Sequence, residues 1–322
     1  MQVVTDSLGR RSRMRATSTG KRIRLTDRDV EWLQFIHRHG PLASSHLLRS
    51  TRSHRRSEKR ARERLGDLFH EANTAHGGPY LTRPHQQFHT IDSRYNQLVY
   101  NLAPAGIEAI RQLDLWSNHS GPSGGPWWHS FMVSSITGSI ELDCHDRDDL
   151  RFISQAQILE RAGLPLSFPV KYRHPSSKQI IECELRPDAM FGLEYLTDRG
   201  SRFRFFVVEA DRSTEPLTSR SRVRKSILSS MLQYQYLLRD GVYRERFKLT
   251  APLIVLFVCS SQPRAERMAE IALANYPLIA PAMLFGVRSE FGEMKLIPRY
   301  TFGQSDQQWI AAGGGRMRID LP

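Results

Sequence analysis

A Ser/Gly/Pro-rich run at residues 118–126 is the feature that most constrains how this chain can fold. Such a composition is typical of a linker, because it keeps no hydrophobic periodicity and favours neither helix nor strand. The run separates residues 1–117 from residues 127–322, and each part is long enough to bury a core of its own. We therefore predict two domains that are divided at this run.

The net charge of +13 is concentrated near the N-terminus. Residues 1–64 contain 17 Lys and Arg against 6 Asp and Glu, whereas the remaining residues contain 29 against 27. A segregated positive potential attracts a polyanion and releases its counterions, which makes nucleic acid the first candidate partner. An anionic membrane surface competes, but no amphipathic apolar face accompanies these basic residues. We expect double-stranded DNA as the partner, and no membrane.

The three cysteines, Cys144, Cys183 and Cys259, lie far apart and form no Cys-x-x-Cys pair. This spacing argues against a disulfide framework and against a structural zinc site. The longest apolar run, at 253–259, is too short to span a bilayer, and no apolar run follows the basic N-terminal residues. We expect a cytoplasmic protein.

Residues 25–117 have the element order helix, helix, helix, hairpin, helix, which is that of a winged helix-turn-helix domain. Before them, residues 1–24 are polar, Arg-rich and aperiodic, and we expect a flexible basic arm. Thr26 is expected to cap the first helix, which ends before Gly40. The other expected elements are helices at 43–49, 53–71 and 104–113 and strands at 80–83 and 95–102.

The third expected helix combines an apolar stripe with a crowded basic flank. Its stripe consists of Ala61, Leu65, Leu68 and Phe69. In a winged domain the third helix enters the major groove, so basic residues near its start are expected to contact bases and phosphates. A basic flank that is merely solvated is the alternative. The candidate DNA-binding residues are Arg52, His54, Arg55, Arg56, Lys59, Arg60 and Arg62.

Residues 127–322 are expected to form an α/β (α+β) domain with a mixed sheet flanked by helices. The expected helices are at 127–142, 149–162, 218–239 and 265–275. The expected strands are at 168–172, 179–185, 203–210, 253–259, 283–287 and 294–297.

Three carboxylates in this part of the chain could carry chemistry. Asp188 follows one expected strand, and Glu209 and Asp211 end the next. Alternation along a strand places Glu209 and Asp211 on one face, and a neighbouring strand end can bring Asp188 beside them. Converging carboxylates favour a hard cation, so we expect all three to bind Mg²⁺ or Mn²⁺. In the alternative, Asp188 caps a turn and the other two pair with nearby arginines.

With these motifs the sequence resembles the PD-(D/E)xK nuclease superfamily. Over residues 25–260 it also resembles the plasmid replication-relaxation family and the MobC-type mobilisation relaxases. The resemblance implies a winged helix-turn-helix joined to a restriction-endonuclease-like fold. The residues that match the shared pattern are His129, Glu141, Pro187, Asp188, Glu209, Asp211, Arg212, Lys225 and Tyr234. Of these, His129, Glu141, Asp188, Glu209, Asp211 and Lys225 are the candidate catalytic residues.

One departure leaves two functions open. The superfamily pattern has Lys two residues after the strand Glu, where this sequence has Asp211. That Lys would orient the attacking water, and Lys225 or Arg212 would have to replace it. If one does, we expect a metal-dependent nickase or relaxase acting at a plasmid or mobile-element origin. If neither does, we expect a non-catalytic initiator, transfer accessory factor or regulator. Other transfer or replication proteins, and a second copy of the chain, are open as further partners.

Overall fold

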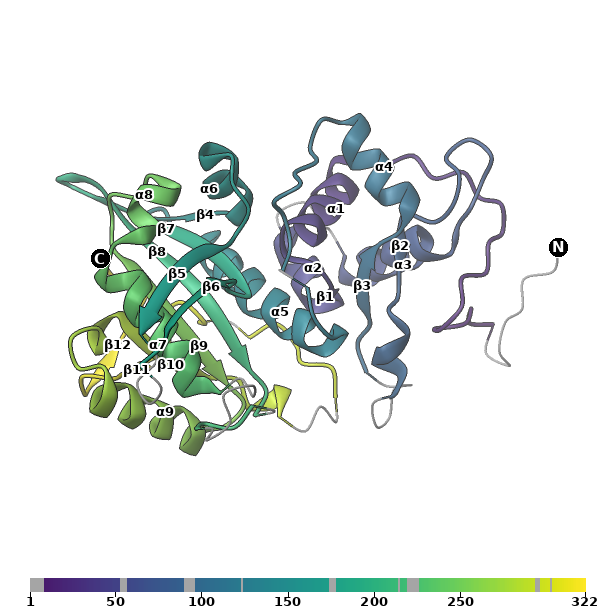
Figure 1. The fold of residues 1–322 in the computed structure, drawn as a ribbon. Helices are drawn as coiled ribbons and strands as arrows, with labels where there is room; N and C mark the ends of the chain where they lie inside the picture. The colour runs from purple at the N-terminus through teal and green to yellow at the C-terminus, as the bar shows by residue number, and fades with distance from the viewer. Residues whose placement is uncertain are drawn as a thin grey trace. The chain divides into compact units, whose positions relative to one another are not determined.

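The computed structural model describes most of the chain in two compact units (Figure 1). One unit comprises residues 1–121 and 294–301, and the other comprises residues 122–293 and 302–322. The division after residue 121 falls within the expected linker, whereas residues 294–301 belong to the first unit and not to the second domain that we expected. The described residues are 9–52, 57–89, 96–122, 124–173, 178–213, 215–218, 226–292, 296–301 and 303–322.

In the first unit, helices are interspersed along the chain with the strands of a small antiparallel sheet. The strand order of the sheet is β1-β3-β2. The elements are α1 (Asp27–His39), β1 (Leu42–Ala43), α2 (Ser44–Ser50), α3 (Glu58–His70), β2 (Leu81–Thr82), the 3-10 helix η2 (His85–His89), β3 (Val99–Leu102) and α4 (Pro104–Gln112). Every helix expected here is present, with bounds that agree closely wherever the residues are described.

Local signals explain these helices. Thr26 caps α1 in a capping box with Asp29, and Gly40, with φ of 94°, ends it. Trp32 of α1 is fully buried and donates its indole N–H to the carbonyl of Leu47 in α2, at 2.6 Å. The stripe expected on α3 is buried, and α3 packs against α2 and β2.

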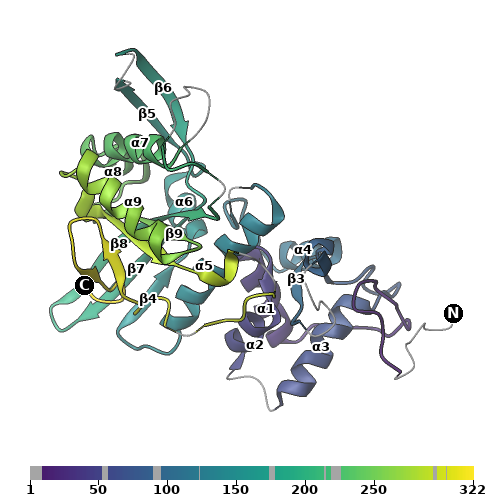
Figure 2. The ribbon, with the colours of Figure 1, turned by 90° about the horizontal axis from the view of Figure 1, so that it is seen from below.

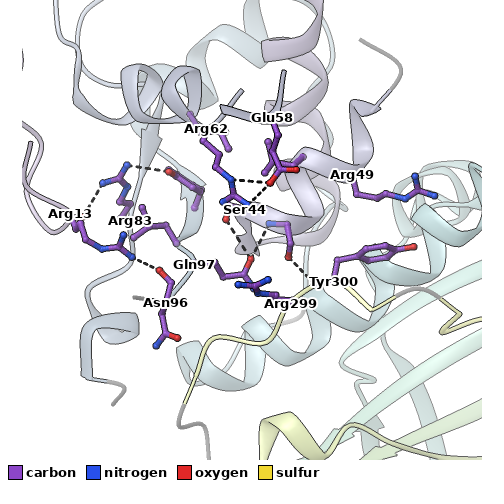
Figure 3. Close-up of a pocket in the computed structure, with 15 residues that line it drawn as sticks. Arg13, Ser44, Arg49, Glu58, Arg62, Arg83, Asn96, Gln97, Arg299 and Tyr300 are labelled. Atoms are coloured by element: carbon purple, nitrogen blue, oxygen red, sulfur yellow. Dashed lines mark hydrogen bonds and ion pairs between the residues drawn. The ribbon is translucent and has the colours of Figure 1, made fainter. Parts of the chain in front are cut away.

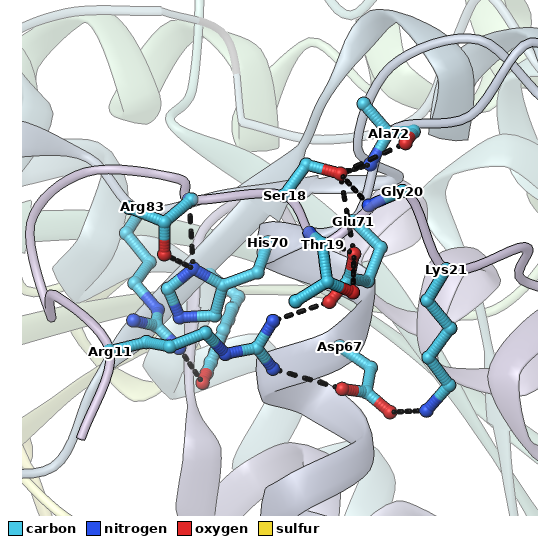
Figure 4. A network of polar contacts seen from close by, with 12 residues as sticks. Arg11, Ser18, Thr19, Gly20, Lys21, Asp67, His70, Glu71, Ala72 and Arg83 are labelled. Carbon is cyan, nitrogen blue, oxygen red and sulfur yellow. Dashed lines mark hydrogen bonds and ion pairs between the residues drawn. The ribbon is translucent and has the colours of Figure 1, made fainter. Parts of the chain in front are cut away.

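The described part of the N-terminal arm, residues 9–24, is bound to α3 (Figure 4). Arg11 pairs with Asp67, at 3.0 Å, and with Glu71, while Lys21 pairs with Asp67 at 2.6 Å. Thr19 donates its backbone N–H to Glu71 at 2.8 Å. The arm that the sequence predicts as flexible is thus held here by two carboxylates at the C-terminal end of α3.

A seven-stranded mixed sheet forms the centre of the second unit. Its order is β12-β11-β10-β9-β8-β7-β4, with β9 parallel to both β8 and β10 and the other pairs antiparallel. The strands are β4 (Leu150–Ile153), β7 (Ala189–Thr197), β8 (Gly200–Asp211), β9 (Leu253–Cys259), β10 (Met283–Val287), β11 (Trp309–Ala311) and β12 (Arg316–Met317). A separate hairpin of β5 (Phe168–Arg173) and β6 (Ile180–Leu185) extends away from this sheet (Figure 2).

Five α-helices accompany the sheet in the described residues. They are α5 (Trp127–Cys144), α6 (Gln155–Ala162), α7 (Ile227–Arg239), α8 (Val242–Phe247) and α9 (Gln262–Asn275). Val255 and Phe257 of β9 share one core with α7 and α9. Helix α5 packs against β4, β7 and β8. The expected α/β class is therefore confirmed, and no described helix is both long enough and apolar enough to cross a bilayer.

Several elements of this unit differ from the prediction. The helix expected at 149–162 begins as strand β4 and becomes helical only at Gln155. Strands β7, β11 and β12 and helix α8 were not expected. The described part of 294–297, which was expected to be a strand, contains no strand. Asp188 follows the expected strand, which is present as β6, and it also directly precedes β7 of the main sheet.

Candidate functional site

The carboxyl end of β8 is where the predicted catalytic carboxylates meet. Glu209 and Asp211 lie at the last positions of β8, opposite Phe257 and Cys259 of the parallel strand β9. Asp188 lies directly before β7, which runs antiparallel to β8, and its backbone N–H donates to the carbonyl of Val208 at 3.1 Å. The topology thus brings together three residues that are up to 23 positions apart in sequence.

These residues line a cavity of about 480 Å³ within the second unit. The first turn of α5 contributes His129, and α7 contributes Ile227 and Ser230. Arg212, which directly follows β8, also lines the cavity, and burial lowers the pKa of its guanidinium. The cavity therefore contains both acidic and basic side chains.

Asp188 has a hydrogen-bond partner on each oxygen. Oδ1 lies 2.9 Å from Nε2 of His129, and Oδ2 accepts the backbone N–H of Ala210 at 2.8 Å. The first contact orients the imidazole ring, and the second fixes the carboxylate to β8. Of the candidate catalytic residues, His129 and Asp188 thus lie in direct contact.

Glu209 is held by Tyr234 of α7. The fully buried hydroxyl of Tyr234 donates to Oε1 of Glu209. Burial raises the pKa of Tyr234 well above its ordinary value, and the negative charges of Glu209 and Asp188 raise it further. Tyr234 therefore stays protonated and acts as a hydrogen-bond donor, since a tyrosinate nucleophile would require a lowered pKa.

Asp211 forms a buried ion pair with Arg264 of α9. Nε of Arg264 donates to Oδ2 and Nη2 donates to Oδ1 at 3.1 Å, while the Asp211 side chain is 4 % exposed. Arg264 also donates to the carbonyl of Glu215 at 2.5 Å. Both oxygens of Asp211 thus serve as acceptors for one guanidinium.

The Asp211–Arg264 ion pair affects whether the three carboxylates can bind the expected metal ion. A Mg²⁺ or Mn²⁺ ion bound by the trio would need carboxylate oxygens directed at one point. In the described part of the chain, no three His, Cys, Asp or Glu side chains are arranged as a metal-ligand group. With Asp211 paired to Arg264, the three carboxylates as they lie do not fit the expected site.

Glu141, another candidate catalytic residue, does not line this cavity. Glu141 lies on α5 twelve residues after His129, which corresponds to about 18 Å along a helix. It is buried, and its carboxylate lies 3.7 Å from His145. Lys225 lies outside the described residues.

The candidate DNA-binding residues lie in the first unit. Lys59, Arg60 and Arg62 are exposed on the flank of α3 opposite its buried stripe. Arg52, just after α2, is exposed as well. His54, Arg55 and Arg56 fall outside the residues that the structure describes.

Residues 33–252, more than half of the chain, match the family described as replication-relaxation. The chain belongs to the replication-relaxation family. Membership suggests a role in the replication or transfer of plasmids or mobile elements. The match includes the cavity carboxylates and α3, but it ends before Arg264. Neither a curated protein nor a solved structure matches the chain.

Arg264 is the residue of this site that sequence reasoning missed. It lies 53 residues after Asp211 and outside the part of the chain that matches the replication-relaxation family. The sequence pattern that could have indicated Arg264 is the strand at 253–259 followed by a helix with Pro263 in its first turn. Because β9 runs parallel to β8, the first turn of that helix begins beside the end of β8.

Proposed function

We propose that this protein binds double-stranded DNA in the replication or transfer of a plasmid or mobile element, and that its first unit is a winged helix-turn-helix reader. The observation that carries the proposal is the division of α3 into a buried apolar stripe and an exposed basic flank. The order of the elements and the three-stranded sheet support the interpretation of the first unit as a winged helix-turn-helix domain. Family membership supports the biological role.

The exposed charges explain how such a helix would bind. Within the described residues, Lys59 and Arg60 form no ion pair and are exposed, so their charge faces solvent. Cations of this kind neutralise DNA phosphates and release condensed counterions, which makes the affinity strongly dependent on salt. Binding should therefore weaken steeply as the salt concentration rises.

The double substitution Lys59→Ala/Arg60→Ala tests the proposal. We expect a loss of about 10- to 100-fold in duplex affinity, and a decrease of about two in the slope of log K against log salt. Fluorescence anisotropy with labelled duplexes measures both. The matched control is Arg161→Ala/Arg267→Ala, which removes two exposed arginines of the second unit. If both double variants bind like the wild type, DNA recognition by α3 is wrong.

We propose strand cleavage in the second unit as a second candidate function, related to the nickase that the PD-(D/E)xK and MobC-type resemblance implies. What favours it is the cavity in which the His129–Asp188 contact and Glu209 come together. Against it stands the Asp211–Arg264 pair, which favours a non-catalytic initiator, accessory factor or regulator.

A nicking assay separates these two candidates. Supercoiled plasmid carrying candidate origins is incubated with the wild type and with Asp188→Asn, in Mg²⁺, in Mn²⁺ and in EDTA. Cleavage predicts open circles with the wild type and a loss of at least about 100-fold with Asp188→Asn. Unchanged supercoils with a wild-type protein that still binds duplex would favour the non-catalytic role.

A further inference from the structure

A second cavity, of about 640 Å³, lies within the first unit (Figure 3). Five arginines from five segments of the chain line it, and Glu58 is its one acidic lining residue among those described. The arginines are Arg13 of the arm, Arg49 of α2, Arg62 of α3, Arg83 after β2, and Arg299 of the 296–301 segment. Serine, asparagine, glutamine, tyrosine and leucine residues complete the wall. We call it the arginine cavity.

The 296–301 segment is fixed at this cavity by hydrogen bonds. Gln97 donates its amide N–H to the carbonyls of Ile297, at 3.3 Å, and Pro298, at 2.6 Å. Tyr300 donates its backbone N–H to Oγ of Ser45 at 2.8 Å. A segment about 200 residues distant in sequence thereby brings Arg299 to the cavity.

The arm brings Arg13 in a similar way. Arg83 donates to the carbonyl of Arg13 at 3.0 Å, and Arg13 donates to the carbonyl of Asn96. The ion pairs of Arg11 and Lys21 with the end of α3 hold the arm on either side of this contact. Arg13 is therefore a positioned part of the wall.

Arg83 provides the evidence for an anionic ligand. It is 8 % exposed, its Nη2 donates to the hydroxyl of Tyr100 at 3.1 Å, and its guanidinium lies 3.9 Å from the ring centroid of Phe69. Within the described residues no carboxylate pairs with Arg83 or Arg13. Burial lowers the pKa of both guanidinium groups, the positive charge of Arg83 lowers that of Arg13 further, and the positive charge of Arg11 lowers that of Arg83. Buried cations without a counter-charge are unfavourable, and an anion would offset that cost.

We propose that the arginine cavity binds a phosphate group of the DNA that α3 contacts, with Arg299 and Arg13 as phosphate-binding residues. The proposal rests on the proposed function. Guanidinium groups bind phosphate oxygens through paired hydrogen bonds, and the hydroxyl and amide groups of the wall add further donors. Arg62 lines the cavity and also belongs to the exposed flank of α3, so the two surfaces are continuous. Arg13 and Arg299 both lie outside residues 33–252, which match the family.

Arg299 is the residue to test, because its side chain is exposed and its removal leaves the core intact. In the full chain, Arg299→Ala should weaken duplex binding about five- to tenfold at 0.1 M salt and lower the salt slope by about one. Arg299→Lys should restore the slope, because it keeps the charge. Arg267→Ala, which removes an exposed arginine of the second unit, should leave both quantities unchanged.

The outcomes also separate this proposal from the one on which it depends. Loss of affinity in Lys59→Ala/Arg60→Ala with none in Arg299→Ala would overturn the phosphate site and leave DNA binding by α3 intact. No effect of either variant would overturn both. A free nucleotide is the other source of phosphate. If ADP raised the melting temperature of the wild type but not of Arg299→Ala, while duplex affinity stayed equal, the assignment to DNA would be wrong.

Discussion

The arginine cavity of the first unit and the end of β8 in the second unit use arginine in opposite ways. Within the described residues, Lys59 and Arg60 on the flank of α3 are exposed without an acidic partner, and Arg83 in the arginine cavity is buried without one. At the end of β8, the guanidinium of Arg264 forms an ion pair with one buried carboxylate, that of Asp211. Unmatched positive charge is available to a polyanion, whereas matched charge stabilises the fold. This contrast supports the proposal that the first unit binds DNA, and it makes the proposed cleavage in the second unit depend on that unit's internal pairs.

Breaking the Asp211–Arg264 pair should have the largest effect on stability. Arg264→Ala leaves Asp211 buried without its guanidinium, so we expect the free energy of unfolding of the second unit to fall by about 3 kcal/mol. Chemical denaturation measures the loss. Arg267→Ala on the same helix is the control, since its pair with Glu270 is 63 % exposed on both sides and should cost less than about 0.5 kcal/mol. Equal losses in the two variants would contradict the distinction between buried and exposed pairs.

The helices of the first unit could be predicted from the sequence more readily than the ion-pair partners of its charged residues. Thr26, Gly40 and Pro104 mark helix ends through local chemistry, and the contacts of α1 and α2 are close in sequence. Helix boundaries could therefore be read from the chain itself. The binding of the arm could not, because it depends on Asp67 and Glu71, which lie about 50 residues away.

The second unit shows where sequence reasoning failed. Strand β7 was missed because its residues are buried in succession instead of alternating, and Gly192 interrupts the pattern. A Cβ atom at this glycine would lie 3.0 Å from the ring of Phe205, so a larger residue would require the ring to shift. Sequence grouped Asp188 with Glu209 and Asp211, and the structure places them at one cavity. Their partners, above all Arg264, depend on the parallel pairing of β8 and β9, which no local pattern encodes.

Lowering the pH should reduce the free energy of unfolding of the first unit through His70, by less than the loss expected for Arg264→Ala. His70 accepts the backbone N–H of Thr17 on Nδ1 at 3.1 Å, and burial together with Arg83 and Arg11 lowers its pKa to about 4. The unfolded chain, with an ordinary pKa of about 6.5, binds the proton first as the pH falls. Stability present above pH 6.5 is therefore lost progressively between pH 6.5 and 4.

Thermal or chemical unfolding at pH 7 and pH 5 measures this loss, for which we expect about 1 to 2 kcal/mol. Asp67 and Glu71 also have lowered pKa values, through their partners in the arm, but they lose their contribution only below about pH 4.5. His70→Gln is the control, because it cannot titrate in this window. A wild-type stability that is equal at both pH values, or one that falls equally in His70→Gln, would show that His70 does not bind the arm as a neutral ring.

A small effect on stability is expected for an exposed ion pair of the first unit. Glu58 of α3 contacts Arg62 at 2.7 Å, with both side chains about half exposed (Figure 3). Glu58→Gln should lower the free energy of unfolding by less than about 1 kcal/mol, because water screens the pair and the first helical turn loses one negative charge. It should also raise duplex affinity about two- to threefold, since Arg62 then faces phosphate without a competing carboxylate. Anisotropy and denaturation on the same samples measure both quantities. Glu63→Gln, which removes an exposed charge from the same helix, should raise affinity less; an equal rise would assign the effect to net charge and not to the release of Arg62.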